Sequence, residues 1–425
     1  MKAVLANRIF LDVDGQTKTD LKEKLTYRIP ARHQKDFPTV IRNVKNVKPN
    51  IVSIPSGATK HIPESYEIID KRITKDVEFP EFKGTLRPTQ QDIYDDVDSS
   101  CIINAKVSFG KTFTALAIAG KLKQKTLIVT HTVALRNQWQ REIEKVYRFT
   151  PGIIGSGKFE VDTPIVISNV QTLNKKLSSV SKMFGLTVID ESHHCPSTTF
   201  TKILDSMWSK YKIGLTGTLQ RKDGKHIIFR DYFGEKIIQP PTENSLSPEV
   251  YIHYSNFKLA DGMQWAQRVN KLVYDKGYQK EISAITAAFA AKGHKVLLVA
   301  DRVEFLENCA ELIGENAVCI TGNIKNDNER EELLSLVESG EKNVLAGTQS
   351  IFSEGISCNP LSCIVLATPI NNEPLLEQLV GRIQRIHPDK LTPAVIDINL
   401  QGNTAKRQAK ARLGFYMKQG WKIAT

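Results

Sequence analysis

Short apolar runs alternate with longer helical stretches between residues 86 and 239. The runs lie at 100–104, 126–130, 164–168, 187–190 and 212–216. Most positions in each run are apolar, which is typical of strands in a parallel sheet that helices cover on both faces. The pattern therefore predicts a doubly wound α/β domain, which we place at residues 84–240.

The same alternation returns after a segment that is rich in proline. Residues 239–250 read QPPTENSLSPEV, a composition typical of a linker between domains. Further apolar runs follow at 295–300, 317–321, 344–347, 363–368 and 394–398. We predict a second α/β domain over residues 241–425, so that the fold class is α/β with two tandem domains built on parallel sheets.

The first 83 residues have a different pattern. Short alternating runs, as at Ile9, Leu11 and Val13, and frequent prolines predict a small β-rich module at 1–83. Thr17 and Asp20 predict the capping box of a short helix. Basic residues outnumber acidic ones in this module, so it either contacts nucleic acid or is a solvated structural addition; the sequence leaves both interpretations open.

The charge balance of the whole chain points to a polyanionic partner. The 425 residues include 58 Lys and Arg against 46 Asp and Glu, a net charge of +12. This surplus favours nucleic acid over a membrane surface as the partner. The chain contains no apolar run long enough to span a bilayer and no signal peptide, and its six scattered cysteines form no CxxC pair. We therefore expect a soluble, intracellular protein with reduced cysteines.

One local pattern predicts a phosphate-binding loop. Residues 105–112 read AKVSFGKT and differ from the common P-loop only in having Ala105 in place of the first Gly. The loop follows the run at 101–104 and opens a predicted helix at 112–121. Its backbone N–H groups would face a triphosphate, while Lys111 neutralises the β and γ oxygens and the Thr112 hydroxyl binds Mg²⁺. ATP and Mg²⁺ are the predicted cofactors.

A second pattern supplies the carboxylates that a P-loop requires. The apolar run at 186–189 leads directly into Asp190 and Glu191. Asp190 is suited to hold Mg²⁺, and Glu191 to orient or deprotonate the attacking water. The alternative is a pair of N-cap carboxylates after a strand. The neighbouring residues 193–195 (HHC) are consecutive and have no distant partner, so we do not predict a zinc site there.

Two arginines in the second half are candidates for transition-state stabilisation. Arg382 and Arg385 are three residues apart and would share one face of a helix. Guanidinium groups bind phosphate oxygens as charge develops during phosphoryl transfer. The alternative is a solvated basic helix face.

Taken together, these patterns resemble the superfamily 2 helicases and translocases over residues 86–385. Residues 86–90 (LRPTQ) look like the adenine-side motif, 105–112 like motif I and 130–139 (THTVALRNQW) like motif Ia. Residues 190–193 look like a DExH form of motif II, 215–218 like motif III, 344–357 like motif V and 378–385 like motif VI. The sequence departs from many members at Ser192 in motif II and at Val380 in motif VI.

The resemblance implies two RecA-like domains with ATP between them. It gives catalytic roles to Lys111, Asp190, Glu191, Gln378, Arg382 and Arg385, and Mg²⁺ to Thr112 and Asp190. Nucleotide contacts would come from Gln90, Ala105, Ser108, Gly110, Lys111, Thr112, Asp190 and Gly355. Nucleic-acid contacts would come from Thr132, Arg136, Gln171, Thr172, Arg302 and Thr348. His193, Thr216 and Thr218 would couple the two sites, the two threonines from the loop after a strand.

Within the superfamily, residues 215–224 (LTGTLQRKDG) are most similar to the UvsW-type, RecG-like and XPB-like group. That similarity implies an ATP-dependent DNA helicase that remodels forked, branched or single-stranded DNA, in a host cytoplasm if the chain is of phage origin. An RNA helicase, a duplex translocase that does not separate strands, and a nucleotide-gated clamp are the alternatives. Nothing in the sequence requires more than a monomer.

The last 25 residues carry six Lys or Arg and no acidic residue, with Phe415, Tyr416 and Trp421 among them. They predict either a nucleic-acid surface or an amphipathic helix whose aromatic side chains pack on the second domain. Both can hold together.

Overall fold

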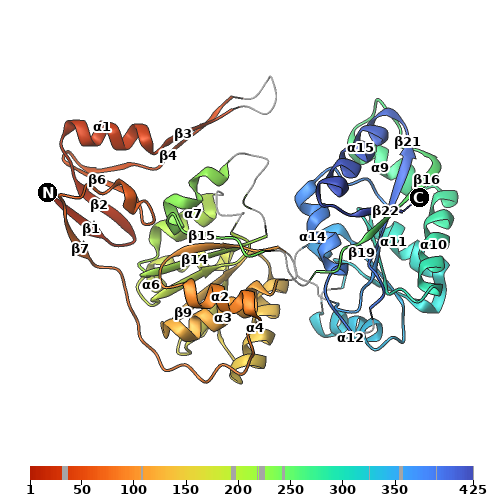
Figure 1. The fold of residues 1–425 in the computed structure, drawn as a ribbon, viewed down its shortest axis with the longest axis horizontal. Coiled ribbons are helices and arrows are strands. Elements are labelled where there is room, and N and C mark those ends of the chain that lie inside the picture. Colours follow the sequence, from red (N-terminus) through yellow and green to blue (C-terminus); the bar gives the residue numbers. More distant parts are fainter. Residues whose placement is uncertain are drawn as a thin grey trace. The chain divides into compact units, whose positions relative to one another are not determined.

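A computed structural model describes most of the chain. The described residues are 1–30, 37–106, 109–192, 198–217, 219, 225–241, 245–324, 326–353, 358–388 and 390–424. The chain divides into two compact units, Met1–Thr242 and Glu243–Thr425 (Figure 1). The first unit contains both the N-terminal module and the first α/β domain. The predicted boundaries at 83/84 and 240/241 stay predictions.

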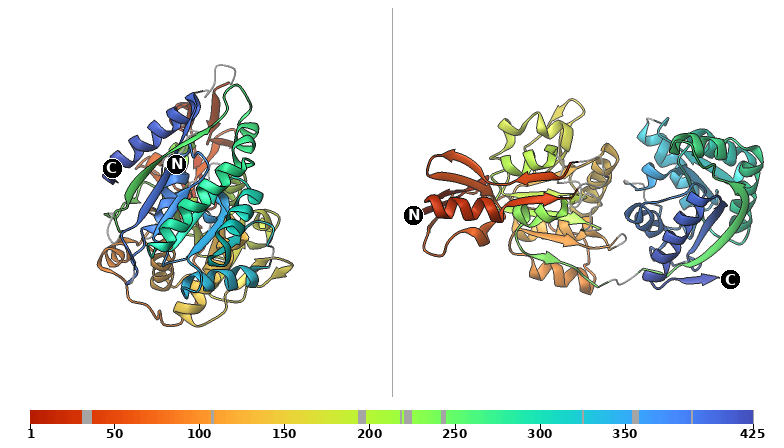
Figure 2. Two further views of the ribbon diagram at one scale, coloured as in Figure 1. Left: turned by 90° about the vertical axis from the view of Figure 1, so that its right-hand side faces the viewer. Right: turned by 90° about the horizontal axis from the view of Figure 1, so that it is seen from above.

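The N-terminal module is β-rich, as predicted. Its sheet has the order β5-β6-β2-β1-β7, and β3 pairs with β4 in a separate ribbon. Leu21 of helix α1 and Leu25, which caps its end, share a buried core with the sheet residues Ile9 and Leu11. Figure 2 shows the helix beside the strands of the module. The elements are β1 (Lys2–Leu5), β2 (Arg8–Asp12), α1 (Gly15–Lys24), β3 (Thr26–Ile29), β4 (Thr39–Arg42), β5 (Lys45–Lys48), β6 (Ile51–Pro55) and β7 (Glu67–Asp70).

The predicted cap of the first helix was wrong. Helix α1 begins at Gly15, and the carboxylate of Asp14 accepts the N–H of Thr17 at 2.7 Å. Asp20 instead accepts from Gln16 within the helix. Asp14 provides the better acceptor because it lies directly before the first turn, where the backbone N–H groups have no partner inside the helix.

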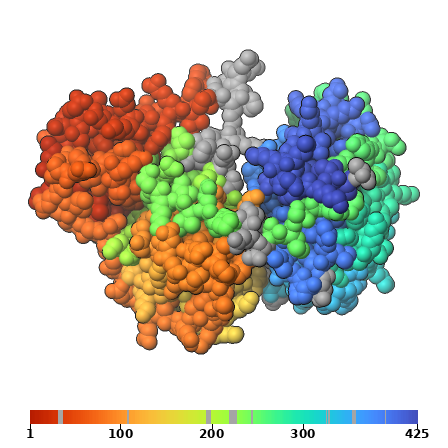
Figure 3. All heavy atoms as spheres, in the orientation of Figure 1, coloured from red at the N-terminus to blue at the C-terminus, as the bar shows by residue number. Residues whose placement is uncertain are grey.

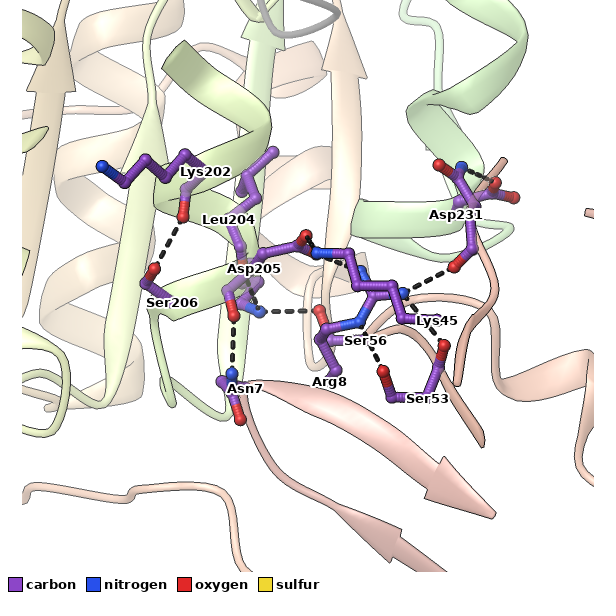
Figure 4. A network of polar contacts seen from close by, with 12 residues as sticks. Asn7, Arg8, Lys45, Ser53, Ser56, Lys202, Leu204, Asp205, Ser206 and Asp231 are labelled. Carbon is purple, nitrogen blue, oxygen red and sulfur yellow. Dashed lines mark hydrogen bonds and ion pairs between the residues drawn. The ribbon is translucent and has the colours of Figure 1, made fainter. Parts of the chain in front are cut away.

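Buried polar contacts join the module to the first α/β domain (Figure 4). Arg8, only 4% exposed, forms an ion pair with Asp205 of α7 (Thr198–Ser206). Its guanidinium also donates to the carbonyl oxygens of Asn43, at 2.5 Å, and Ser53, at 3.1 Å. The Asn43 amide in turn donates to Asp231 at 2.6 Å. The module therefore packs directly against the domain, and the space-filling view shows the two in contact (Figure 3).

Lys212 is buried where the module meets the domain. Its Nζ donates to Ser56 Oγ of the module at 2.6 Å and to the carbonyl of Leu204 at 3.2 Å. Burial disfavours the charged ammonium and lowers the pKa of Lys212 to about 7. Between pH 7 and the pKa of a solvated lysine, the unfolded chain therefore binds more protons at this position than the folded chain.

This difference predicts how stability changes with pH. The free energy of unfolding of the wild type should rise relative to that of Lys212→Met as the pH increases from 7 to 10, by roughly 1.4 kcal/mol per pH unit at most. Below pH 7 the lysine is charged in both states, so the difference should stay constant there. Urea denaturation of both proteins across this range checks the expectation. A difference that does not change with pH would contradict the lowered pKa.

The sheet of the first α/β domain has the order β11-β10-β12-β9-β13-β14-β8-β15. Its strands pair in parallel except β11, which is antiparallel to β10. The strands are β8 (Cys101–Asn104), β9 (Thr126–Thr130), β10 (Gly152–Gly155), β11 (Lys158–Phe159), β12 (Ile165–Asn169), β13 (Leu186–Ile189), β14 (Tyr211–Thr216) and β15 (Ile237–Ile238). The five predicted apolar runs are all strands of this sheet.

Helices cover both faces of this sheet (Figure 1). One face packs against α2 (Pro88–Asp96), α3 (Lys111–Leu122) and α4 (Val133–Tyr147). The other face packs against α5 (Val170–Asn174), α6 (Leu177–Val180), α7 and α8 (Phe229–Phe233). The strands are buried on both sides, which explains why most of their positions are apolar.

The second unit has a parallel sheet of order β18-β19-β17-β20-β21-β16-β22. Its strands are β16 (Glu249–Lys258), β17 (Val296–Ala300), β18 (Ala317–Ile320), β19 (Val344–Thr348), β20 (Cys363–Leu366), β21 (Ala394–Gln401) and β22 (Lys422–Ala424). Its helices are α9 (Trp265–Val273), α10 (Lys276–Ala291), α11 (Val303–Ile313), α12 (Asp327–Glu338), α13 (Gln349–Ser353), α14 (Glu373–Ile383) and α15 (Asn403–Lys418). Strands β16 and β22 lie outside the predicted runs.

The C-terminal aromatic side chains belong to the core. Phe415 and Tyr416 of α15 are buried, and Trp421 packs against both rings. Arg412 forms a buried ion pair with Asp397 of β21, at 2.6 Å. The packed-helix interpretation is therefore confirmed, while the exposed basic residues Lys406, Arg407 and Lys410 leave a nucleic-acid role untested. Among the described residues, no helix has both the length and the apolar character of a membrane span.

Candidate nucleotide-binding site

Three strands of the first unit end close together at one edge of the sheet. Strands β8, β14 and β13 are neighbours in that order and run in parallel, so their carboxyl ends meet. The P-loop follows β8, Thr216 ends β14, and Asp190 follows β13. In open α/β sheets, ligands bind outside the carboxyl ends of the strands. The fold thus brings the separate sequence patterns to the edge where a ligand is expected.

The described part of the P-loop leads directly into the N-terminus of helix α3. Gly110 is the N-cap of α3 and has φ +87°, a left-handed conformation that favours glycine. A Cβ at this position would lie 2.7 Å from Gln90 Nε2. The ammonium of Lys111 donates to the carbonyl oxygens of Ala105, at 2.8 Å, and Lys106, at 3.3 Å. Thr112 lies in the first turn of α3, where N–H groups favour an anion.

Gln90 packs directly against this loop. Its Oε1 accepts the N–H of Arg87 at 3.0 Å, and its Nε2 donates to the carbonyl of Phe109 at 2.9 Å. Both ends of the amide therefore have protein partners, and Gln90 joins the start of α2 to the P-loop. Its predicted contact with the adenine base stays a prediction.

Asp190 is held at the end of β13 with both carboxylate oxygens in use. Its Oδ1 accepts the N–H of Glu191 at 2.9 Å, and its Oδ2 accepts the indole N–H of Trp139 at 2.8 Å. Burial, reinforced by the charge of Glu191, raises the pKa of Asp190 to about 6, while Trp139 and Lys111 act in the opposite direction. Glu191 has φ +48°, an uncommon conformation for a residue other than glycine.

This environment fits a divalent cation. Two adjacent carboxylates, one of them 6% exposed, repel each other where water cannot screen them. With the Thr112 hydroxyl they are hard oxygen ligands of the type that Mg²⁺ prefers. A bound cation would offset both the burial of the Asp190 carboxylate and its repulsion from Glu191, the two causes that raise the pKa of Asp190. Among the described residues, no cluster of three or more His, Cys, Asp or Glu forms another candidate metal site.

Thr216 lies in the strand and not in the loop that follows it. It is the fully buried last residue of β14, which agrees with the predicted run at 212–216 but not with the expectation that it acts from the loop after the strand. Its carbonyl accepts the N–H of Ala105 at 3.0 Å, which extends the β14–β8 pairing up to the P-loop. That pairing keeps Thr216 in the strand. Its coupling role stays a prediction.

The second unit places the two arginines on different elements. Arg382 is buried in α14, and its Nε donates to the carbonyl of Phe352 at 2.8 Å. Arg385 was predicted on the same helix face, but α14 ends at Ile383. Arg385 instead pairs as an isolated bridge with Ser245, and its Nη1 donates to Asn359 Oδ1 at 3.0 Å. The backbone pairing with Ser245 lies directly after the end of the helix. Gln378 is partly buried in α14.

The predicted nucleic-acid contacts of the first unit differ in accessibility. The Thr132 hydroxyl caps α4 by accepting the N–H of Leu135 at 3.3 Å. Arg136 is buried and donates to Ser156 Oγ at 2.9 Å. On α5, Gln171 is exposed and Thr172 is partly buried. The roles of all four stay predictions.

The second unit places its two predicted nucleic-acid contacts at the carboxyl edge of its sheet. Arg302 follows β17 at the start of α11, and its Nε donates to Asn270 Oδ1 at 2.7 Å. Thr348 ends β19, and its hydroxyl lies 3.2 Å from that of Ser350. Their roles also stay predictions. Four further predicted residues lie outside the described part of the chain: Ser108, His193, Thr218 and Gly355.

Trp139 is the residue at this site that the sequence patterns missed. It lies in the stretch 130–139, but its spacing from Ile143 and Val146 on α4 is typical of a helix face that packs in the core. That spacing predicts no contact with the site. Its contact with Asp190 spans 51 residues in sequence. No local pattern distinguishes an indole that bonds a carboxylate from one that only fills the core.

Comparisons with known proteins identify relatives of this chain. A family model of the type III restriction enzyme res subunit matches residues 82–221, and one of the helicase conserved C-terminal domain matches residues 279–387. A probable helicase, D10 of Escherichia phage T5, is 40% identical and aligns over 100% of this chain and 96% of its own length.

The names of two further relatives specify different nucleic acids, RNA in one and DNA in the other. A putative ATP-dependent RNA helicase, L396 of Acanthamoeba polyphaga mimivirus, is 28% identical over 97% of this chain and 83% of its own. The ATP-dependent DNA helicase uvsW of Enterobacteria phage T4 is 24% identical over 75% of this chain and 70% of its own.

Two solved structures show the same fold at low identity. The Saccharomyces cerevisiae Dbp5 structure covers 79% of this chain and 89% of its own, with a TM-score of 0.59 and 11% identity. The Pyrococcus furiosus Hef helicase domain covers 77% of this chain and 98% of its own, with a TM-score of 0.51 and 13% identity. The predicted α/β class with two RecA-like domains is confirmed.

Proposed function

Because this chain belongs to the superfamily 2 helicases and is an ATP hydrolase of that class, we propose that it acts on DNA and remodels forked or branched substrates. The observation that carries the ATP chemistry is the meeting of Lys111, Asp190 and the P-loop at one sheet edge. The DNA assignment draws support from the net charge of +12 and from the likeness to the T4 DNA helicase.

The chemistry that we propose for the nucleotide follows from the positions of these side chains. Lys111 exchanges its carbonyl partners for the β and γ phosphate oxygens when ATP binds. Thr112 and Asp190 would hold Mg²⁺, which would neutralise charge on the phosphates. Glu191 orients the attacking water. Arg382 and Arg385 supply positive charge to the transferring phosphoryl group, a contribution of about a thousandfold or more in rate where such arginines act.

An RNA substrate is the second candidate, because the mimivirus relative carries the name of an RNA helicase. The chain shares more of its length with that relative than with the T4 enzyme. The exposed basic residues of the module and of α15 suit a phosphate backbone of either kind.

The test is the steady-state ATPase rate against a matched panel of nucleic acids. The panel contains single-stranded DNA, linear duplex, a fork and a four-way junction of the same sequence, and single-stranded RNA. A reaction without nucleic acid gives the basal rate. We expect the fork and junction to stimulate hydrolysis most. Equal or greater stimulation by RNA would replace the substrate assignment, and equal stimulation by all DNA forms would remove the preference for branched DNA.

A further inference from the structure

The indole of Trp139 is bonded to the carboxylate that we assign to Mg²⁺. Its Nε1 donates to Asp190 Oδ2 at 2.8 Å, and the side chains are 1% and 6% exposed. A hydrogen bond to a buried carboxylate is strong because water does not compete for the acceptor. It also fixes the direction in which the remaining lone pairs of Asp190 point.

Trp139 belongs to the helix that begins at the predicted nucleic-acid contacts. Helix α4 is capped by Thr132 and carries Arg136, and Trp139 follows two turns after the cap, about 10 Å along the axis. Ile143 and Val146 pack the same helix into the domain core. The Tyr147 hydroxyl donates to the carbonyl of Leu116 at 2.7 Å, which joins the far end of α4 to α3, the helix that follows the P-loop.

We propose that Trp139 is a positioning residue that links nucleic-acid contact at the start of α4 to the metal-binding carboxylate of Asp190. The inference rests on the proposed function, since it requires nucleic acid to engage this end of α4. A displacement of the helix moves the indole, and the hydrogen bond transmits that movement to Asp190. Trp139 itself touches neither nucleotide nor nucleic acid.

The hydrogen bond has a consequence for metal affinity. Groups that orient a metal ligand contribute about 10- to 100-fold to affinity or activity. With the indole N–H removed, the Asp190 carboxylate loses one of its two fixed partners and must be ordered by the cation itself. Both the Mg²⁺ requirement and the response to nucleic acid should therefore change together, whereas a loss of packing alone changes only stability.

The decisive variant is Trp139→Phe, which keeps an aromatic ring in the core and removes the donor. We expect its stimulation of ATPase by nucleic acid to fall about tenfold, with a matching rise in the Mg²⁺ concentration that gives half-maximal activity. Calorimetric titration with Mg·ADP should show weaker binding in the same variant. Ile143→Val is the matched control, because it trims the same helix face one turn on without touching Asp190, and it should keep the wild-type stimulation.

The failure of the inference can be distinguished from the failure of the proposed function. If nucleic acid stimulates wild type and Trp139→Phe by the same factor, Trp139 has no coupling role. If no nucleic acid stimulates the wild type, the proposed function fails first.

A measurement on the wild-type sequence covers the case in which Trp139→Phe does not fold. The indole N–H resonance of Trp139, assigned by replacing the other three tryptophans one at a time, should shift when Mg·ADP is added and again when nucleic acid is added. A resonance that nucleic acid leaves in place would contradict the link.

Discussion

Replacing Lys111 with Ala is expected to lower the ATPase rate by about a hundredfold or more, because the substitution removes a charge that acts on the transferring phosphate. The Lys111 ammonium lies 2.8 Å from the carbonyl oxygen of Ala105, at the start of the P-loop. Its positive charge favours the ionised carboxylate of Asp190 and therefore acts to lower the pKa of that group. Nucleic-acid binding should persist, since Lys111 lies in the nucleotide site. A coupled ATPase assay and fluorescence anisotropy measure the two properties.

The matched control is Lys106→Ala, which removes an exposed lysine from the same loop. It should retain most of the wild-type turnover. Equal loss in both variants would indicate a general effect of loop charge. Retained turnover in Lys111→Ala would show that the nucleotide binds elsewhere.

Replacing Asp397 with Ala is expected to destabilise the second unit by about 3–5 kcal/mol, because it leaves the Arg412 guanidinium buried without its carboxylate. Arg412 Nε and Nη2 donate to Asp397 at 2.6–3.0 Å, and the Tyr416 hydroxyl donates to the same carboxylate at 2.9 Å. The side chains of the ion pair are 6% and 2% exposed. Urea denaturation of the full chain, followed by tryptophan fluorescence, measures the change.

Tyr416→Phe is the control for this prediction. It removes one hydrogen bond and preserves the ion pair, so the expected cost is about 1 kcal/mol. Equal losses in Asp397→Ala and Tyr416→Phe would show that the charge pair adds nothing beyond an ordinary hydrogen bond.

The sequence predicted those strands that are covered by helices on both faces of the sheet. Strands such as β9 and β17 have helices on both faces, so they are buried along their whole length and their sequences are mostly apolar. Strand β16 (EVYIHYSNFK) lies near the edge of its sheet, and polar residues alternate along it. Alternation of this kind, next to a proline-rich linker, does not distinguish a strand from an extended connection.

The candidate site was predictable where its chemistry is local in sequence. The P-loop and the Asp190–Glu191 pair are short patterns whose neighbours in the chain are also their neighbours in space. Such patterns do not predict contacts between segments that are distant in sequence. Arg385 lies beyond its helix and pairs with Ser245, Arg136 is buried beside Ser156, and the Trp139 indole donates to Asp190. Each outcome depends on tertiary packing that overrides local preference.

The most direct test of the central claim is strand displacement on a labelled DNA fork, followed in the presence of ATP, a non-hydrolysable analogue and no nucleotide. We predict displacement or branch movement with ATP alone, and its loss in Lys111→Ala at protein concentrations that still bind the fork. Fork-stimulated hydrolysis without any displacement or branch movement would contradict the claim that this chain remodels DNA.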